Sequence, residues 1–85
     1  MASYSISVKK SAEKELRTVP KSDLARIVHR IQALPVNPRP HGSEKLSGEE
    51  GYRIRQGDWR IIYRIDDTAK TIEIIKIGHR REIYR

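Results

Sequence analysis

The stretch that decides the fold is YRIRQGDWRIIYR, residues 52–64, in which two alternating segments flank the dipeptide Gly57-Asp58. A two-residue turn with glycine first is typical of a type II′ β-hairpin. Such a turn pairs Gln56 with Trp59 and sets the register of everything that follows. The predicted partners are then Arg55 with Arg60, Ile54 with Ile61, Arg53 with Ile62, and Tyr52 with Tyr63.

This register gives the predicted hairpin two chemically different faces. The face that can meet helices carries Tyr52, Ile54, Ile61 and Tyr63. The opposite face carries Arg53, Arg55, Arg60 and Arg64. Like charges directly opposite each other destabilise a strand pair by a few tenths of a kcal/mol, and a bound polyanion would reverse that sign. We favour a phosphate-binding surface over the alternative, in which the arginines stay solvated with their stems on apolar neighbours.

The flanking segments supply the rest of the fold. Residues 4–8 alternate as a half-buried strand, and residues 71–77 form an isoleucine-rich strand. Ala12, Leu16 and Val19 recur at helical spacing, with Ser11 available as an N-cap, and this helix stops at Pro20. A second helix ends at Pro35, and its apolar stripe consists of Leu24, Ile27, Val28, Ile31 and Leu34. Residues 35–50 are rich in proline and glycine and predict an irregular connection.

The order β-α-α-β-β-β predicts an α+β fold. In this fold an N-terminal helical hairpin packs on a small, mainly antiparallel twisted sheet. Residues 80–85 form either a short C-terminal helix or a tail. Because 85 residues leave no room for a second core, we expect residues 1–85 to form a single domain.

The charge balance points to a polyanionic partner. Eighteen Lys and Arg against eleven Asp and Glu give a formal charge of +7 and a pI near 10.1. Nucleic acid, an acidic protein and an anionic membrane surface would all fit this balance. Residues 1–50 carry nine basic and six acidic side chains, and residues 51–85 carry nine and five. Folding must therefore create any basic patch.

Several classes of site and location are disfavoured by the sequence. The chain has no cysteine, which excludes disulfides and thiolate metal sites. It has no HExxH motif and no glycine-rich phosphate loop, so we expect neither a metal nor a cofactor. The start Met1-Ala2-Ser3-Tyr4 does not resemble a signal peptide, and no apolar run reaches the ~20 residues that cross a bilayer. We therefore expect a cytoplasmic protein that does not bind membranes.

Metal-free RNA cleavage is one chemistry that these residues would permit. It requires activation of a 2′-hydroxyl, stabilisation of charge on phosphorus, and protonation of the leaving oxygen. Arginines suit the second task, because their planar donors bind phosphate oxygens in pairs. For proton transfer the candidates are Tyr84 and His79. Tyr84 could instead be a packing anchor, and His79 could instead be structural or contact phosphate.

Four blocks of the sequence resemble the RelE/ParE toxin superfamily. They are Lys45-Leu46-Ser47-Gly48, Gly51-Tyr52-Arg53-Ile54-Arg55, Trp59-Arg60-Ile61-Ile62-Tyr63 and Ile77-Gly78-His79-Arg80-Arg81-Glu82-Ile83-Tyr84. Their order and spacing make a more specific signature than any block alone, and the resemblance spans nearly the whole chain. It implies a toxin of a type II toxin–antitoxin pair with a RelE-like fold.

The resemblance also implies roles for individual residues. RelE members cut mRNA in the ribosomal A site without a metal. Arg53 and Arg55 stand where RelE has lysines proposed to activate the 2′-hydroxyl and bind phosphate, so the arginines favour phosphate binding. Arg60 and Arg80 stand at arginines that stabilise the transition state and assist the leaving group, although Arg81 is an alternative to Arg80. Tyr84 stands at a tyrosine that orients the cleaved nucleotide. Arg64, His79 and Arg81 are expected to contact RNA phosphate.

The expected partners are an acidic RelB-like antitoxin, the ribosome and mRNA. We expect the toxin alone to be a monomer that forms a hetero-oligomer with its antitoxin. Two other functions stay open on the sequence alone. One is a ParE-like, non-enzymatic poison of DNA gyrase, and the other is a catalytically weak RNA-binding homologue.

Overall fold

The computed structural model describes residues 3–46 and 51–79. Two helices and five strands follow one another in the order β1 (Ser5–Val8), α1 (Lys10–Leu16), α2 (Lys21–Ala33), β2 (Glu44–Lys45), β3 (Tyr52–Gln56), β4 (Trp59–Asp66) and β5 (Thr71–His79). The predicted α+β class and the predicted order of elements are confirmed. The short strand β2 is an addition that lies inside the connection expected to be irregular.

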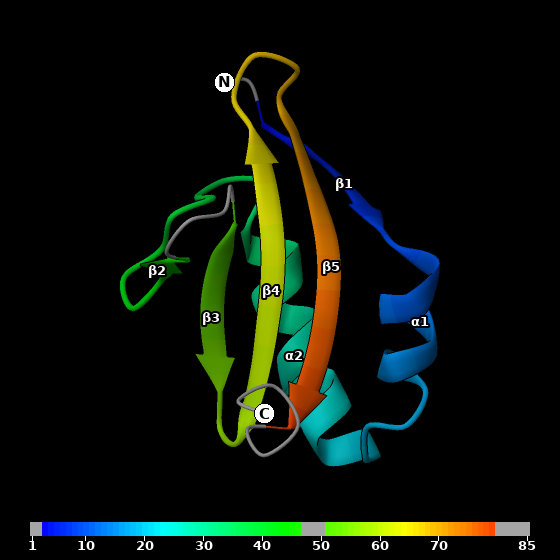
Figure 1. Ribbon diagram of the computed structural model, residues 1–85. Coiled ribbons are helices and arrows are strands. Elements are labelled where there is room, and N and C mark those ends of the chain that lie inside the picture. Colours follow the sequence, from blue (N-terminus) through cyan, green and yellow to red (C-terminus); the bar gives the residue numbers. More distant parts are fainter. Residues whose placement is uncertain (1–2, 47–50, 80–85) are drawn as a thin grey trace.

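The five strands form one sheet in the order β1-β5-β4-β3-β2. β1 runs parallel to β5, and every other neighbouring pair is antiparallel. Figure 1 shows α2 behind the sheet and α1 beside β5, so that neither helix of the described residues covers the front of the sheet. Neither helix in the described part of the chain is long and apolar enough to cross a membrane.

The helix boundaries follow from local backbone constraints. α1 starts at Lys10, and its N-cap is Lys9, so the expectation that Ser11 caps this helix is wrong. The Lys9 N–H donates to the Ile74 carbonyl at 2.9 Å. The chain is therefore hydrogen-bonded to β5 up to Lys9, the residue directly before the helix. Pro20 occupies the N-cap of α2, where its missing N–H costs nothing.

The core lies between the sheet and the two helices. The sheet contributes buried isoleucines and Tyr63, and the helices and the turns that follow them contribute Ala12, Val19, Ile27, Ile31 and Leu34. Burying each of the larger side chains stabilises the fold by about 1.5–3 kcal/mol. The indole Nε1 of Trp59 on β4 donates to Asp23 Oδ2 on α2 at 3.2 Å and adds a polar tie between the layers.

The hairpin of β3 and β4 has the register predicted from its turn. Gln56 pairs with Trp59 and Arg55 with Arg60, and the alternation continues to Tyr52 and Tyr63. Gly57 has φ 62°, which the first central position of a type II′ turn requires and which glycine adopts without strain. The apolar and basic faces of the hairpin are therefore those that the sequence predicts.

A bulge interrupts the pairing of β4 with β5. Tyr63 pairs with Ile74, but the preceding residue Ile62 pairs with Lys76, so that Ile75 has no partner in the register. One extra residue reverses the alternation of faces. Ile72 and Ile74 before the bulge and Ile77 after it all reach the core.

Candidate functional site

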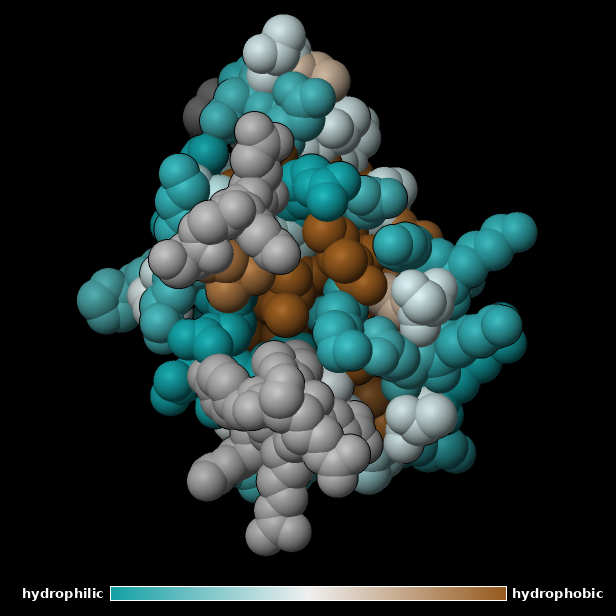
Figure 2. Space-filling view, in the orientation of Figure 1, coloured by the Kyte–Doolittle hydropathy of each residue, from teal (hydrophilic) through white to brown (hydrophobic). Residues whose placement is uncertain are grey.

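The candidate site is the basic side of the β3–β4 hairpin, which we call the arginine face and define as Arg53, Arg55, Arg60 and Arg64. The register places all four on the side of the sheet that faces away from α2. Figure 2 shows this side, with an apolar strip in the middle and hydrophilic side chains around it. Ile62 lies on this face between Arg60 and Arg64. It divides the arginine face into a cluster of three near the hairpin turn and the separate Arg64.

Arg60 lies at the centre of the cluster and is only 6% exposed. Its neighbours across the strands are Arg55 on β3 and Gly78 on β5. Because Gly78 has no side chain, it leaves room for the long side chain of Arg60. Arg60 Nη1 donates to the Trp59 carbonyl at 3.5 Å. A guanidinium held this way, beside a second one, is poised to attract an anion.

Carboxylates flank the arginine face on both sides. Glu44 on β2 pairs with Arg53 at 2.8 Å and with Arg55 at 3.9 Å. Glu73 on β5 pairs with Arg64 at 3.6 Å. In both cases the carboxylate lies directly across the strands from an arginine, since Glu44 is the register partner of Arg53 and Glu73 that of Arg64. The sequence interpretation missed Glu44, because a two-residue strand leaves no periodic signal.

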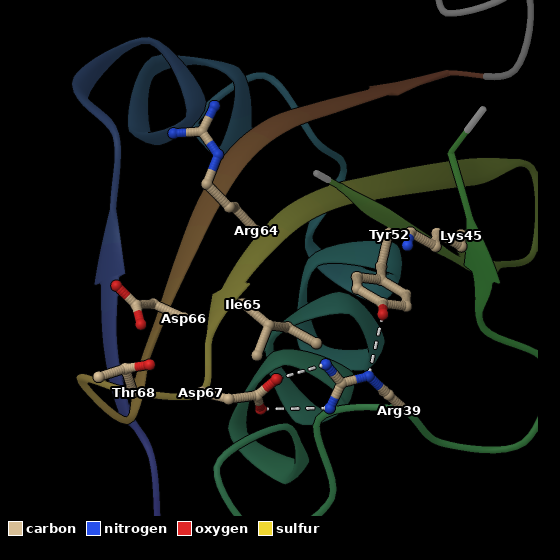
Figure 3. A pocket seen from close by; sticks show the side chains of 8 residues that line it. All are labelled: Arg39, Lys45, Tyr52, Arg64, Ile65, Asp66, Asp67 and Thr68. Carbon is tan, nitrogen blue, oxygen red and sulfur yellow. Dashed lines mark hydrogen bonds and ion pairs between the residues drawn. The ribbon is translucent and has the colours of Figure 1, made fainter. Parts of the chain in front are cut away.

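A polar hollow of about 410 Å³ opens beside the face, between β2, β3 and the β4–β5 turn. In Figure 3 the Arg39 guanidinium lies between Tyr52 and Asp67. Arg39 Nε donates to the Tyr52 hydroxyl at 3.0 Å, and Arg39 Nη2 donates to Asp67 Oδ2 at 2.9 Å. Its cation also lies 5.1 Å from the centre of the Tyr52 ring. Neither Arg39 nor Asp67 was predicted from the sequence as a site residue.

Charge pairing in this hollow shifts two ionisation equilibria. The hydrogen bond from Arg39 holds the pKa of Asp67 below its usual value, and a hydrogen bond from the Tyr4 hydroxyl at 2.6 Å acts in the same direction. The same carboxylate raises the pKa of Arg39, with a smaller contribution from Tyr52. The network ties the proline-rich connection to β3, to the β4–β5 turn and to the start of the chain.

The remaining predicted site residues lie elsewhere. His79 pairs with Trp59, and its ring meets the Trp59 indole edge-on at 5.6 Å. Since Trp59 reaches Asp23 on α2, this pair lies on the helix side of the sheet and not on the arginine face. Arg80, Arg81 and Tyr84 lie outside the described residues. Within residues 3–46 and 51–79, no three His, Asp or Glu side chains gather as metal ligands would.

Comparisons with known proteins agree with this fold. A family model described as the ParE toxin of type II toxin–antitoxin systems matches residues 6–84. The chain belongs to this toxin family. The superfamily inferred from the four sequence blocks is therefore confirmed.

Individual relatives of this toxin carry the RelE name. This chain is 32% identical over 84 residues to the toxin RelE of Mycobacterium tuberculosis, and the alignment covers 96% of this chain and 87% of the relative. Its fold matches the RelE chain of an archaeal RelE–RelB complex from Pyrococcus horikoshii, with a TM-score of 0.83, 31% identity and coverage of 92% and 96% of the two chains. A RelBE2 toxin–antitoxin complex from M. tuberculosis matches with a TM-score of 0.79, 28% identity and coverage of 91% and 98%.

Proposed function

We propose that this toxin is an endoribonuclease that cleaves mRNA in the ribosomal A site without a metal and so inhibits translation. The observation that carries the proposal is the buried Arg60 directly opposite Arg55 on a sheet face that neither α1 nor α2 covers. Paired guanidiniums in one place are costly in a protein without an anionic ligand and favourable in one that binds phosphate. The RelE name of the relatives supports the same choice.

The proposed reaction is an attack of the 2′-hydroxyl on the neighbouring phosphorus. The new bond joins the 2′-oxygen to phosphorus and yields a cyclic phosphate, while the bond from phosphorus to the 5′-oxygen breaks. Arg53 and Arg55 hold the phosphate, and Arg60 stabilises the charge that grows on its oxygens in the transition state. Arg80 assists the leaving oxygen, with Arg81 as the alternative, and Tyr84 orients the nucleotide and takes part in proton transfer.

The remaining predicted contacts extend this surface along the RNA. Arg64 binds a neighbouring phosphate, since it stands on the same face beyond Ile62. Arg81 is a further proposed contact to RNA phosphate, whereas His79 packs on Trp59 on the helix side of the sheet and is not part of this surface. We further propose that the toxin acts in the cytoplasm as a monomer, and that an acidic antitoxin neutralises it in a hetero-oligomer. The Pyrococcus and Mycobacterium structures that match are toxin–antitoxin complexes.

The proposal is tested by mapping mRNA 5′-ends in a translating extract by primer extension. Wild-type toxin should produce cuts at A-site codons. Arg55→Ala, Arg60→Lys and Tyr84→Phe should each reduce cutting about 10²-fold or more, the usual cost of losing a group that stabilises the transition state. Arg26→Ala is the matched control, because Arg26 is an exposed arginine on α2, behind the sheet. It should cut like wild type.

The main rival is a ParE-like poison of DNA gyrase, and the matching family model carries the ParE name. The same extract distinguishes the two functions. Intact mRNA together with stalled gyrase complexes would contradict RNA cleavage and support the rival. Purified toxin without ribosomes should cut RNA poorly, because the arginine face supplies phosphate clamps and no strong base. Efficient cutting of naked RNA would contradict this ribosome dependence.

A further inference from the structure

Glu44 presents its carboxylate to two arginines at once. One oxygen, Oε2, lies 2.8 Å from Arg53 Nη2, and the other, Oε1, lies 3.9 Å from Arg55 Nη2. The two arginines are the phosphate clamps of the proposed function, and both stand on the same face of β3. Glu44 therefore sets a two-oxygen anion where the RNA phosphate would bind.

The two anions have the same donor requirements. A phosphodiester has one negative charge shared by two non-bridging oxygens, just as a carboxylate has one charge shared by two oxygens. Guanidinium groups bind either of them through paired N–H donors. Both anions cannot occupy the same donors of Arg53 and Arg55 at the same time.

We propose that Glu44 is an intramolecular stand-in for phosphate, which occupies Arg53 and Arg55 in the RNA-free protein and is displaced when RNA binds. This inference rests on the proposed function, because it takes the RNA backbone as the incoming ligand. Under this inference Glu44 lowers the affinity of the protein for RNA. It thereby also limits non-specific binding of the protein to RNA chains in general.

The surroundings of Glu44 fit a carboxylate that can leave. The side chain is 53% exposed and stands on a two-residue strand at the edge of the sheet. Ion pairs exposed to this degree change an equilibrium constant by only about 1.4- to five-fold, which an RNA phosphate with its released counterions can outweigh. Arg53 is only 16% exposed, so its guanidinium stays in place when its partner changes. Arg53 is thus already oriented when RNA arrives.

The test measures binding of a short, fully 2′-O-methylated RNA, which cannot be cleaved, by fluorescence anisotropy at low salt. Glu44→Gln removes the competing charge and keeps the shape of the side chain. It should lower the Kd about two- to five-fold, the upper part of the range expected when an exposed charge pair is removed. Glu13→Gln is the matched control, since it makes the same change of charge at an exposed position on α1, away from the arginine face. Its effect should stay below about two-fold.

A second variant separates occupancy of the clamp from net charge. Glu44→Asp keeps the charge but shortens the side chain, so that it reaches Arg53 and Arg55 less well. It should also bind RNA more tightly than wild type. Unfolding in urea checks that each variant folds like wild type.

The outcomes are distinct from one another. Equal gains in Glu44→Gln and Glu13→Gln, with wild-type affinity in Glu44→Asp, would overturn the inference and leave only a general charge effect. Weaker binding by Glu44→Gln would also overturn it. Tighter binding by both Glu44 variants, without any mRNA cleavage by the wild-type protein, would support the inference and contradict the proposed function. RNA binding that Arg53→Ala leaves unchanged would contradict both.

Discussion

At the scale of single residues, Tyr63 shows how a polar group is fitted into the core. Its side chain is fully buried, and its hydroxyl donates to the Pro38 carbonyl at 2.7 Å. The ring stacks on Tyr52 with a distance of 5.9 Å between centroids. Burial raises the pKa of Tyr63 to about 12, although a hydrogen bond with Ser43 pulls it down. The folded state therefore favours the neutral, protonated form of the Tyr63 phenol.

This shift predicts a loss of stability at alkaline pH. In the unfolded chain a tyrosine loses its proton near pH 10, whereas folded Tyr63 keeps its proton up to about pH 12. The contribution is fully present below pH 10 and is lost as the pH rises toward 12, by about 3 kcal/mol in total. Urea unfolding at about pH 8 and about pH 11 measures the difference.

Tyr63→Phe is the control for this prediction. The variant should lose about 1 kcal/mol at neutral pH, because the Pro38 carbonyl loses its donor. Its free energy of unfolding should then fall less than that of wild type between the two pH values. If both proteins lose the same amount, the alkaline loss belongs to other groups and the prediction is wrong.

The positions of the arginines could be predicted from residues alone, but the position of His79 could not. Arg53, Arg55 and Arg60 follow from a two-residue turn and strict alternation, which leave one choice of face. Counting by twos from Ile72 and Ile74 would place His79 on the arginine face as well. The bulge at Ile75 shifts it to the helix side. In the run TIEIIKI, residues 71–77, isoleucines occupy both even-numbered and odd-numbered positions. The apolar pattern therefore does not show where the alternation of faces is reversed.

At the scale of elements, α1 completes the edge of β5 where β1 ends. β1 pairs with β5 only as far as Val8 and Ile74. Beyond that point the Ile77 N–H donates to Glu15 Oε1 at 3.0 Å, so a side chain on a helix replaces a strand as the acceptor. This bond lies next to the bulge and helps to hold the last part of β5.

Removing this acceptor should destabilise the fold. Glu15→Ala leaves a partly buried N–H without its partner, which costs about 1–3 kcal/mol, whereas Glu15→Gln keeps a carbonyl oxygen and should cost less. Amide exchange of Ile77 should become faster in Glu15→Ala. Glu13→Ala, an exposed position on the same helix, should not change it. Unchanged exchange in Glu15→Ala would show that the bond does not protect β5.

The short strand β2 marks the limit of element prediction for the site. Its two residues carry no alternation, and its place beside β3 depends on a tertiary contact. Glu44 could therefore not be assigned to Arg53 and Arg55 from the sequence. The clamps were predictable because they lie on long periodic strands, whereas their carboxylate partner was not.

At the scale of the whole molecule, the formal charge of +7 is spread evenly along the chain and becomes directional only on folding. The register gathers Arg53, Arg55 and Arg60 near one turn, whereas Arg39 lies beside this face and pairs with Asp67. A basic pI alone would predict that every arginine contributes equally to RNA binding. The fold predicts instead that the contribution of an arginine to RNA binding depends on whether it lies on the arginine face.

Salt dependence distinguishes these two expectations. For single-stranded RNA, the logarithm of the binding constant falls with the logarithm of salt concentration by about 0.7 for each phosphate contacted. Arg55→Ala removes a clamp and should reduce this slope by about 0.7, whereas Arg26→Ala removes the same charge from α2 and should leave the slope unchanged. Titrations of a 2′-O-methylated RNA from low to physiological salt provide the slopes. Equal slopes for the two variants would mean that the net charge, and not the arginine face, holds the RNA.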